Sequence, residues 1–184
     1  MRATTLDEIG AAAGVGRGQL YHFFADKADL VVDVVGFQVE RVISSIQPSF
    51  DAVSTADDVR DWCRGATQYA SAADPLRCPI GSLLYQLDAE AVTARAALRT
   101  GFARWEKIFA EGLRRVADNG GLVAGTDPSM LATSLLAAYQ GGLLLADVSG
   151  DVECLRRALQ TVTDAALVPP STPRPKRRVA PGNP

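Results

Sequence analysis

Apolar residues recur every three or four positions along almost the whole chain, which is the spacing of one face of an α-helix. The strict alternation that marks a half-buried strand is absent from the sequence. The sequence therefore predicts an all-α fold, and 184 residues suit one ordinary domain or a domain with a small appendage. The longest apolar stripe comprises Leu98, Phe102, Trp105, Phe109, Gly112, Leu113 and Val116.

Capping residues and helix breakers set the expected boundaries. Thr5 and Glu8 have the spacing of a capping box before the first helix. Pro48 is expected to end the third helix near Ile46, because proline removes a backbone donor. The expected helices cover residues 6–13, 17–24, 26–46, 79–87, 89–118, 128–146 and 151–167, and a further helix is expected to begin after residues 55–58 and to end near residue 73.

Composition excludes several classes of protein. No stretch reaches 18 apolar residues without a charge, and residues 1–20 hold no continuous apolar block, so neither a membrane span nor a signal peptide is expected. Three cysteines without a C-x-x-C spacing predict neither a disulfide framework nor a zinc cluster, and a cytoplasmic location is expected. A single histidine, His22, leaves no nucleophile–base set, so we expect no enzyme, no metal and no cofactor.

The formal charge of −2 hides an asymmetry. Four cations lie between Arg174 and Arg178, and without them 15 basic residues face 21 acidic ones, a balance of −6. The main body is therefore not a nonspecific binder of polyanions. The basic tail could attract phosphates weakly, although a solvated tail has the same composition.

Residues 5–22 have the pattern of a helix-turn-helix. Apolar residues occupy the inward positions, and the second helix would present its start to the DNA major groove. Arginine can bind guanine, glutamine can bind adenine, and tyrosine or histidine can contact phosphate or a thymine methyl group. Thr5 and Lys27 are placed to hold phosphates. A plain helical hairpin has the same spacing, and residues 1–27 carry no net charge. The outward residues of the second helix are Arg17, Gly18, Gln19, Tyr21 and His22.

The run TTLDEIGAAAGVGRGQLYHFFADKADL, residues 4–30, closely resembles the DNA-binding signature of the TetR family of repressors. Three later segments are similar to the LmrA/YxaF-like branch of that family: CPIGSL at 78–83, GFARW at 101–105 and QGGLLLA at 140–146. The resemblance implies an N-terminal helix-turn-helix with a linker helix (1–47), an effector-binding and dimerisation domain (48–167) and a disordered Pro/Arg-rich tail (168–184).

One departure from the family concerns the start of the chain. Family members usually carry about 20 residues before this point, which form a first helix that covers the back of the helix-turn-helix. We therefore expect the first helix of the DNA-binding unit to be missing here, with loss of burial at Leu6, Ile9, Leu20 and Phe23. A ligand-binding dimer that has lost DNA binding is the alternative function.

Aromatic residues on three converging helices suit an apolar cavity for a small apolar or aromatic effector. Each of them also fits a plain core position, and the family resemblance favours the cavity. The predicted ligand-binding residues are Trp62, Tyr69, Leu83, Phe102, Trp105, Phe109, Tyr139 and Gln140.

The helix expected at 128–146 is apolar nearly all round and must be covered on most sides. A four-helix bundle across a two-fold axis would cover it, as would burial within one chain. We expect a homodimer that binds double-stranded operator DNA. Cys78, before Pro79, fits either a redox sensor or a small buried residue. The predicted dimer interface comprises Leu135, Gly142, Leu143, Leu155, Leu159 and Val162.

Overall fold

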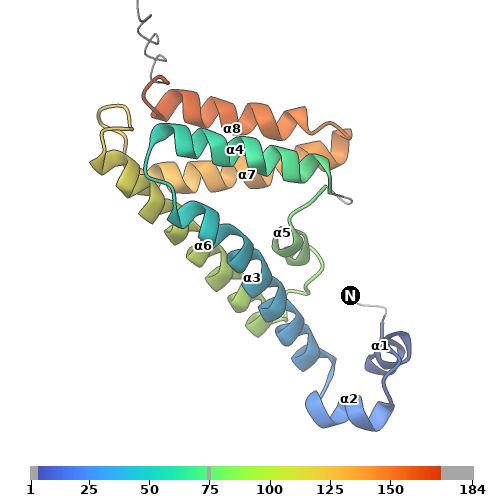
Figure 1. Ribbon diagram of the computed structural model, residues 1–184. Helices are drawn as coiled ribbons and strands as arrows, with labels where there is room; N and C mark the ends of the chain where they lie inside the picture. Colours follow the sequence, from blue (N-terminus) through green and yellow to red (C-terminus); the bar gives the residue numbers. More distant parts are fainter. Residues whose placement is uncertain (1–3, 74–75, 171–184) are drawn as a thin grey trace, which may run out of the picture.

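The computed structural model describes residues 4–73 and 76–170, and these residues form an all-helical fold (Figure 1). Figure 1 shows α1 and α2 as a small unit at the lower end of α3, while α3 and α6 run side by side and α4, α7 and α8 stack across the upper end. The helices are α1 (Leu6–Ala13), α2 (Arg17–Phe23), α3 (Lys27–Asp51), α4 (Ala56–Ser71), α5 (Pro79–Leu84), α6 (Val92–Asp118), α7 (Pro128–Ser149) and α8 (Glu153–Ala166).

The third helix continues through Pro48 to Asp51, so the predicted end near Ile46 was wrong. Two contacts hold its last turn. Phe50 is fully buried and packs on Phe109, with ring centroids 4.4 Å apart. The Arg115 guanidinium of α6 donates to the carbonyl oxygens of Phe50 at 2.8 Å and Asp51 at 3.0 Å. These contacts offset the single backbone hydrogen bond that proline removes.

The long helices α3 and α6 approach closely because α6 carries glycine at two contact positions. A Cβ atom added to Gly101 would lie 2.7 Å from Val39, and one added to Gly112 would lie 2.5 Å from the Phe50 ring. Arg104 of α6 also donates to both carboxylate oxygens of Glu40 on α3. The pair therefore forms one tightly packed unit.

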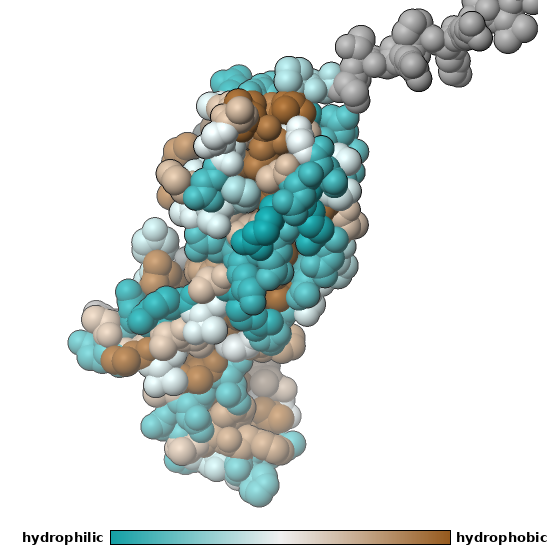
Figure 2. All heavy atoms as spheres, turned by 90° about the vertical axis from the view of Figure 1, so that its left-hand side faces the viewer, coloured by the Kyte–Doolittle hydropathy of each residue, from teal (hydrophilic) through white to brown (hydrophobic). Residues whose placement is uncertain are grey.

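The main core comes from α3 to α8 and the segments between them, and among the described residues it includes none from α1 or α2. Apolar side chains remain exposed near the lower end, including Phe23 at 67% and Phe37 at 67%. Figure 2 shows apolar surface in the lower part of the view, where Figure 1 places these N-terminal helices. The N-terminal helices are thus joined to the body chiefly through α3.

The structure packs α7 between α6 and α8. By length and composition alone, α7 would also pass as a membrane-spanning helix, a test that the core helix of a soluble protein can pass as well. Its contacts with α6 and α8 bury one side of the helix, including Leu131, Leu135 and Ala146. A Cβ added to Gly142 would lie 2.8 Å from the Leu155 Cα atom, which shows how closely α7 and α8 pack.

The residues predicted for the dimer interface lie mostly inside this α7–α8 contact. Leu135, Leu143, Leu155 and Leu159 are buried and Val162 is half-buried, because α8 of the same chain covers this side of α7. The four leucines therefore belong to the core of this chain, and Val162 packs against it. The large exposed apolar residues of α7 are other ones: Met130 near its start, and Leu144, Leu145 at 58% exposure and Val148 at 79% exposure near its end.

Candidate functional site

The N-terminal helices have helix-turn-helix geometry. Gly14 ends α1 with a φ of 68°, a left-handed conformation that glycine adopts without strain. A Cβ at Gly10 would lie 3.3 Å from Leu20, so a small residue is needed where the helices cross. Leu6 and Leu20 are buried, whereas Ile9 is half-buried and Phe23 is exposed. The expected loss of burial therefore holds only in part.

The outward face of α2 is open to solvent. Arg17, Gly18, Gln19, Tyr21 and His22 are all exposed. The Arg17 guanidinium lies 5.5 Å from the centre of the Tyr21 ring and pairs with Asp7 of α1 at 3.2 Å. This exposed ion pair is weak, so the Arg17 guanidinium stays available for other contacts.

Thr5 is less available than expected, because it belongs to the capping box of α1. Its backbone amide donates to the Glu8 carboxylate at 2.6 Å, and its hydroxyl accepts from the Glu8 amide at 3.2 Å. The hydrogen bond from the Thr5 amide lowers the pKa of Glu8, which is therefore charged at neutral pH. A phosphate at Thr5 would have to displace this carboxylate. Lys27 lies in the first turn of α3, beside the helix-turn-helix.

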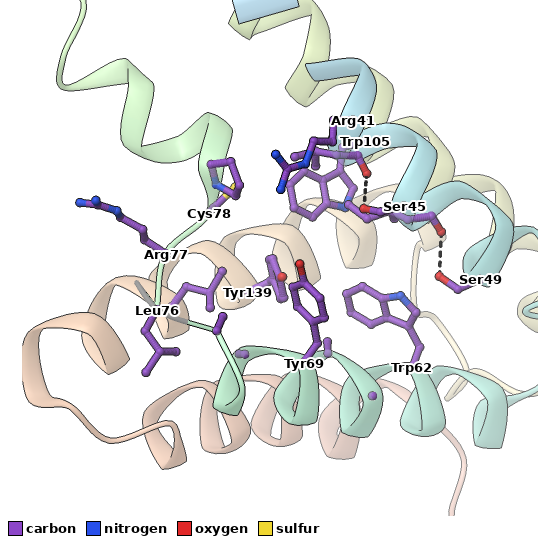
Figure 3. A pocket seen from close by; sticks show the side chains of 18 of the residues that line it. Arg41, Ser45, Ser49, Trp62, Tyr69, Leu76, Arg77, Cys78, Trp105 and Tyr139 are labelled. Atoms are coloured by element: carbon purple, nitrogen blue, oxygen red, sulfur yellow. Dashed lines mark hydrogen bonds between the residues drawn. The ribbon is translucent and has the colours of Figure 1, made fainter. Parts of the chain in front are cut away.

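A cavity of about 530 Å³ opens between α3, α4 and the segment before α5 (Figure 3). Its walls combine aromatic rings from α4, α6 and α7 with a polar side formed by α3. The lining residues are Arg41, Val42, Ser45, Ile46, Ser49, Asp61, Trp62, Gly65, Ala66, Tyr69, Ala70, Ala73, Leu76, Arg77, Cys78, Pro79, Trp105, Tyr139 and Leu143.

Four of the eight predicted ligand residues line this cavity: Trp62, Tyr69, Trp105 and Tyr139. The other four, Leu83, Phe102, Phe109 and Gln140, do not. Their positions explain the difference. Phe109 is fully buried between Phe50 and Trp62, and Phe102 stacks behind Trp105 at a centroid distance of 6.2 Å. Leu83 is buried in α5, and the Gln140 side chain donates to the Cys78 thiol at 3.4 Å.

The polar side of the cavity was not predicted from the sequence. Arg41, Ser45 and Ser49 recur every four residues on α3 and therefore share one face, a spacing that could have revealed them. The Ser45 hydroxyl donates to the Val42 carbonyl at 2.7 Å, and the Ser49 hydroxyl donates to the Ile46 carbonyl at 2.8 Å. Both serines therefore offer lone pairs to the cavity.

Tyr139 and Trp105 determine the charge and the hydrogen-bonding capacity of the inner wall of the cavity. Burial raises the pKa of Tyr139 to about 12, so its hydroxyl stays neutral at physiological pH. Trp105 is only 1% exposed, and its indole N–H has no acceptor among the described residues. Their rings lie 5.5 Å apart. The wall is thus flat, neutral and able to donate hydrogen bonds.

Two of the cysteines, Cys63 and Cys78, are buried. Cys78 is buried at the cavity wall, where its sulfur accepts from the Gly81 amide and from Gln140, each at 3.4 Å. Burial raises the pKa of the Cys63 thiol to about 12, which makes it unreactive. Within residues 4–73 and 76–170, no group of three or more His, Cys, Asp or Glu side chains is arranged to hold a metal ion.

Two family models cover most of the chain. The model described as "Bacterial regulatory proteins, tetR family" matches residues 1–34, and "Tetracyclin repressor-like, C-terminal domain" matches residues 48–162. The first match extends over residues 1–34, so the expected absence of the first helix is not confirmed. The predicted tail at 168–184 falls largely outside the described residues.

Curated relatives and solved structures agree with these matches. The chain is 27% identical to the transcriptional regulator YxaF of Bacillus subtilis over 81% of this chain and 77% of that protein. It is also 27% identical to the transcriptional repressor DhaR of Mycobacterium sp. (strain GP1), over 92% and 84% of the two chains.

Among solved structures, the complex of Stenotrophomonas maltophilia SmeT with triclosan matches with a TM-score of 0.73 and 27% identity, over 95% of this chain and 89% of that one. Reduced Escherichia coli NemR matches with a TM-score of 0.75 and 19% identity, over 93% and 90% of the two chains, which supports the fold alone. A helix-turn-helix at one end of α3, an aromatic cavity toward its other end and two family matches lead to one conclusion: this chain belongs to the TetR family of transcriptional regulators.

Proposed function

We propose that the protein is a transcriptional repressor that binds a palindromic operator as a homodimer and is released by a small, largely apolar effector. One observation carries this proposal: a single helix, α3, begins beside the exposed face of α2 and lines the effector cavity with its second half. A ligand can change DNA affinity only if it binds two states unequally, and a helix shared by both sites provides that coupling. The similarity to the repressor DhaR supports the repressor function, and the similarity to SmeT in complex with triclosan supports the binding of a small molecule.

The DNA contacts would come from α2. Half-sites of a palindromic operator lie about 34–36 Å apart, one turn of DNA, so two α2 helices related by two-fold symmetry would each enter a major groove. A tilt of α3 changes the distance between them. A shift of a few ångströms then removes simultaneous contact with both half-sites. The ligand-binding dimer without DNA binding remains the alternative, and the operator test below separates the two.

Arg17→Ala is expected to weaken binding to the specific operator by about 1–3 kcal/mol and to relax base preference at one position. Lys27→Ala serves as the comparison. It should weaken all DNA sequences alike and lower the salt slope by about one unit. Fluorescence anisotropy with operator and scrambled duplexes measures both effects. A full-length protein that binds the two duplexes equally would contradict the repressor proposal and favour the alternative.

The dimer would use the outward face of α7, where Leu144, Leu145 and Val148 are exposed. Leu145→Asp is expected to convert the dimer to monomer at micromolar concentration, because it places a charge in an apolar contact. Val92→Asp is the matched control, since Val92 is an exposed residue in the first turn of α6, where an acidic side chain is tolerated. Analytical ultracentrifugation distinguishes the two states. A monomeric wild-type protein, or a dimer that survives Leu145→Asp, would reject this interface.

A further inference from the structure

Charge around the effector cavity is unbalanced. Three charged side chains line it: Arg41, Arg77 and Asp61. The Asp61 carboxylate is already paired with Arg64 on the same helix. Among the described residues, neither Arg41 nor Arg77 has an ion-pair partner. The cavity therefore carries uncompensated positive charge, which favours an anionic ligand.

The two arginines differ in direction. In Figure 3 the Arg41 side chain extends from α3 across the cavity edge toward Cys78 at the start of α5. The guanidinium of Arg77 turns away from the aromatic rings. Arg41 is thus the cation that a ligand among those rings would meet, and Arg77 is a natural control.

Of the three polar residues that α3 contributes to the cavity, Arg41 is the one that can donate hydrogen bonds to an anion. The hydroxyl protons of Ser45 and Ser49 are donated to carbonyls of their own helix, so these serines offer no proton to an anion. Arg41 can offer a carboxylate two parallel hydrogen bonds, the strongest arrangement available to such a pair.

The aromatic walls opposite α3 determine which shape of ligand the cavity favours. Trp62, Trp105 and Tyr139 form a connected cluster in which each ring lies within 6 Å of another. Flat rings of this kind favour a flat aromatic partner. The buried indole N–H of Trp105, which has no acceptor among the described residues, belongs to the same cluster. A volume of about 530 Å³ lies in the usual range for small-molecule sites.

We propose that the cavity binds a planar aromatic monoanion, with its acidic group on Arg41 of α3 and its rings among Trp62, Trp105 and Tyr139. This inference rests on the proposed function, in which the cavity is the effector site. It also predicts how the ligand is oriented in the cavity. The charged end would bind α3, the same helix that begins beside the DNA-reading unit, so the strongest single contact would act on the connecting helix directly.

The test compares two ligands of equal shape. We expect 2-naphthoate to bind the full-length wild-type protein at least about tenfold more tightly than the neutral 2-naphthamide, because a hydrogen bond to a charged group contributes more than a neutral one. Arg41→Gln should remove that preference while naphthamide binding stays unchanged. Arg41→Lys should restore part of it, and Arg77→Gln should leave it intact. Isothermal titration calorimetry at two salt concentrations measures all four proteins.

Each outcome decides the inference. Equal affinities in the wild type, a preference for the amide, no binding of either compound, or a preference that survives Arg41→Gln would overturn it. Operator release is measured separately by anisotropy. A naphthoate that binds through Arg41 yet leaves operator affinity unchanged would support the anion site and contradict the proposed effector function, so the two failures are distinguishable.

Discussion

Trp105→Ala is expected to lower the free energy of unfolding by about 3–5 kcal/mol, the usual cost of removing a large buried aromatic side chain. Trp105 is only 1% exposed, stacks on Phe102 and meets Phe109 and Tyr139 edge-on. For a chain of this size, the midpoint of thermal unfolding should fall by roughly 6–20 °C. Differential scanning calorimetry measures the change.

Tyr69→Ala is the matched control for this prediction. Tyr69 also lines the cavity, but it is 73% exposed, so its removal should change stability by no more than about 0.5 kcal/mol. Together the two variants distinguish a cavity residue that stabilises the fold, Trp105, from one that would only contact the ligand, Tyr69. A Trp105→Ala protein as stable as Tyr69→Ala would mean that the aromatic cluster is not part of the core.

Gly112→Ala is expected to destabilise the protein by about 1–3 kcal/mol, the cost of overpacking a filled interior. The added methyl group would meet Phe50, whose own position is fixed by Phe109 and by Trp62. The close contact between α3 and α6 would have to open. Urea unfolding followed by circular dichroism gives the difference directly.

Gly36→Ala makes the same chemical change in a helix, at a position with no neighbouring atom within 4 Å. It should stabilise the protein by roughly 0.5–1 kcal/mol, because alanine is the better helix former. Opposite signs for the two variants are the expected result. If both variants gained stability, α3 and α6 would not be packed as closely as the structure places them.

Local signals predicted the helices well, because their causes lie within a few residues of each other. The capping box predicted at Thr5–Glu8 is formed. The end of α3 could not be predicted in this way. Its last turn is held by Arg115, more than 60 residues further along the chain, so the local effect of Pro48 was outweighed by a contact that the sequence does not display.

The site was predicted in part for a related reason. The stripe on α6 places Phe102, Trp105 and Phe109 on similar faces, yet only Trp105 reaches the cavity, because depth depends on the neighbouring helices. The polar residues of α3 that line the cavity were not predicted. For α7, apolar residues all round the helix could not show which side α8 covers. Leu143 was assigned to the interface, while Leu144 and Leu145 remain exposed.

The separation of α1 and α2 from the main core has a consequence for local unfolding of the protein. Buried apolar contact sets the free energy needed for local opening, and regions with little of it open without global unfolding. The body shares one continuous cluster, whereas the helix-turn-helix has only Leu6 and Leu20 as large buried apolar side chains among the described residues. Backbone amides of α1 and α2 should therefore exchange with solvent through local opening, at a lower free energy than those of α6. Operator DNA, by holding α2 in place, would then stabilise the least protected part of the chain.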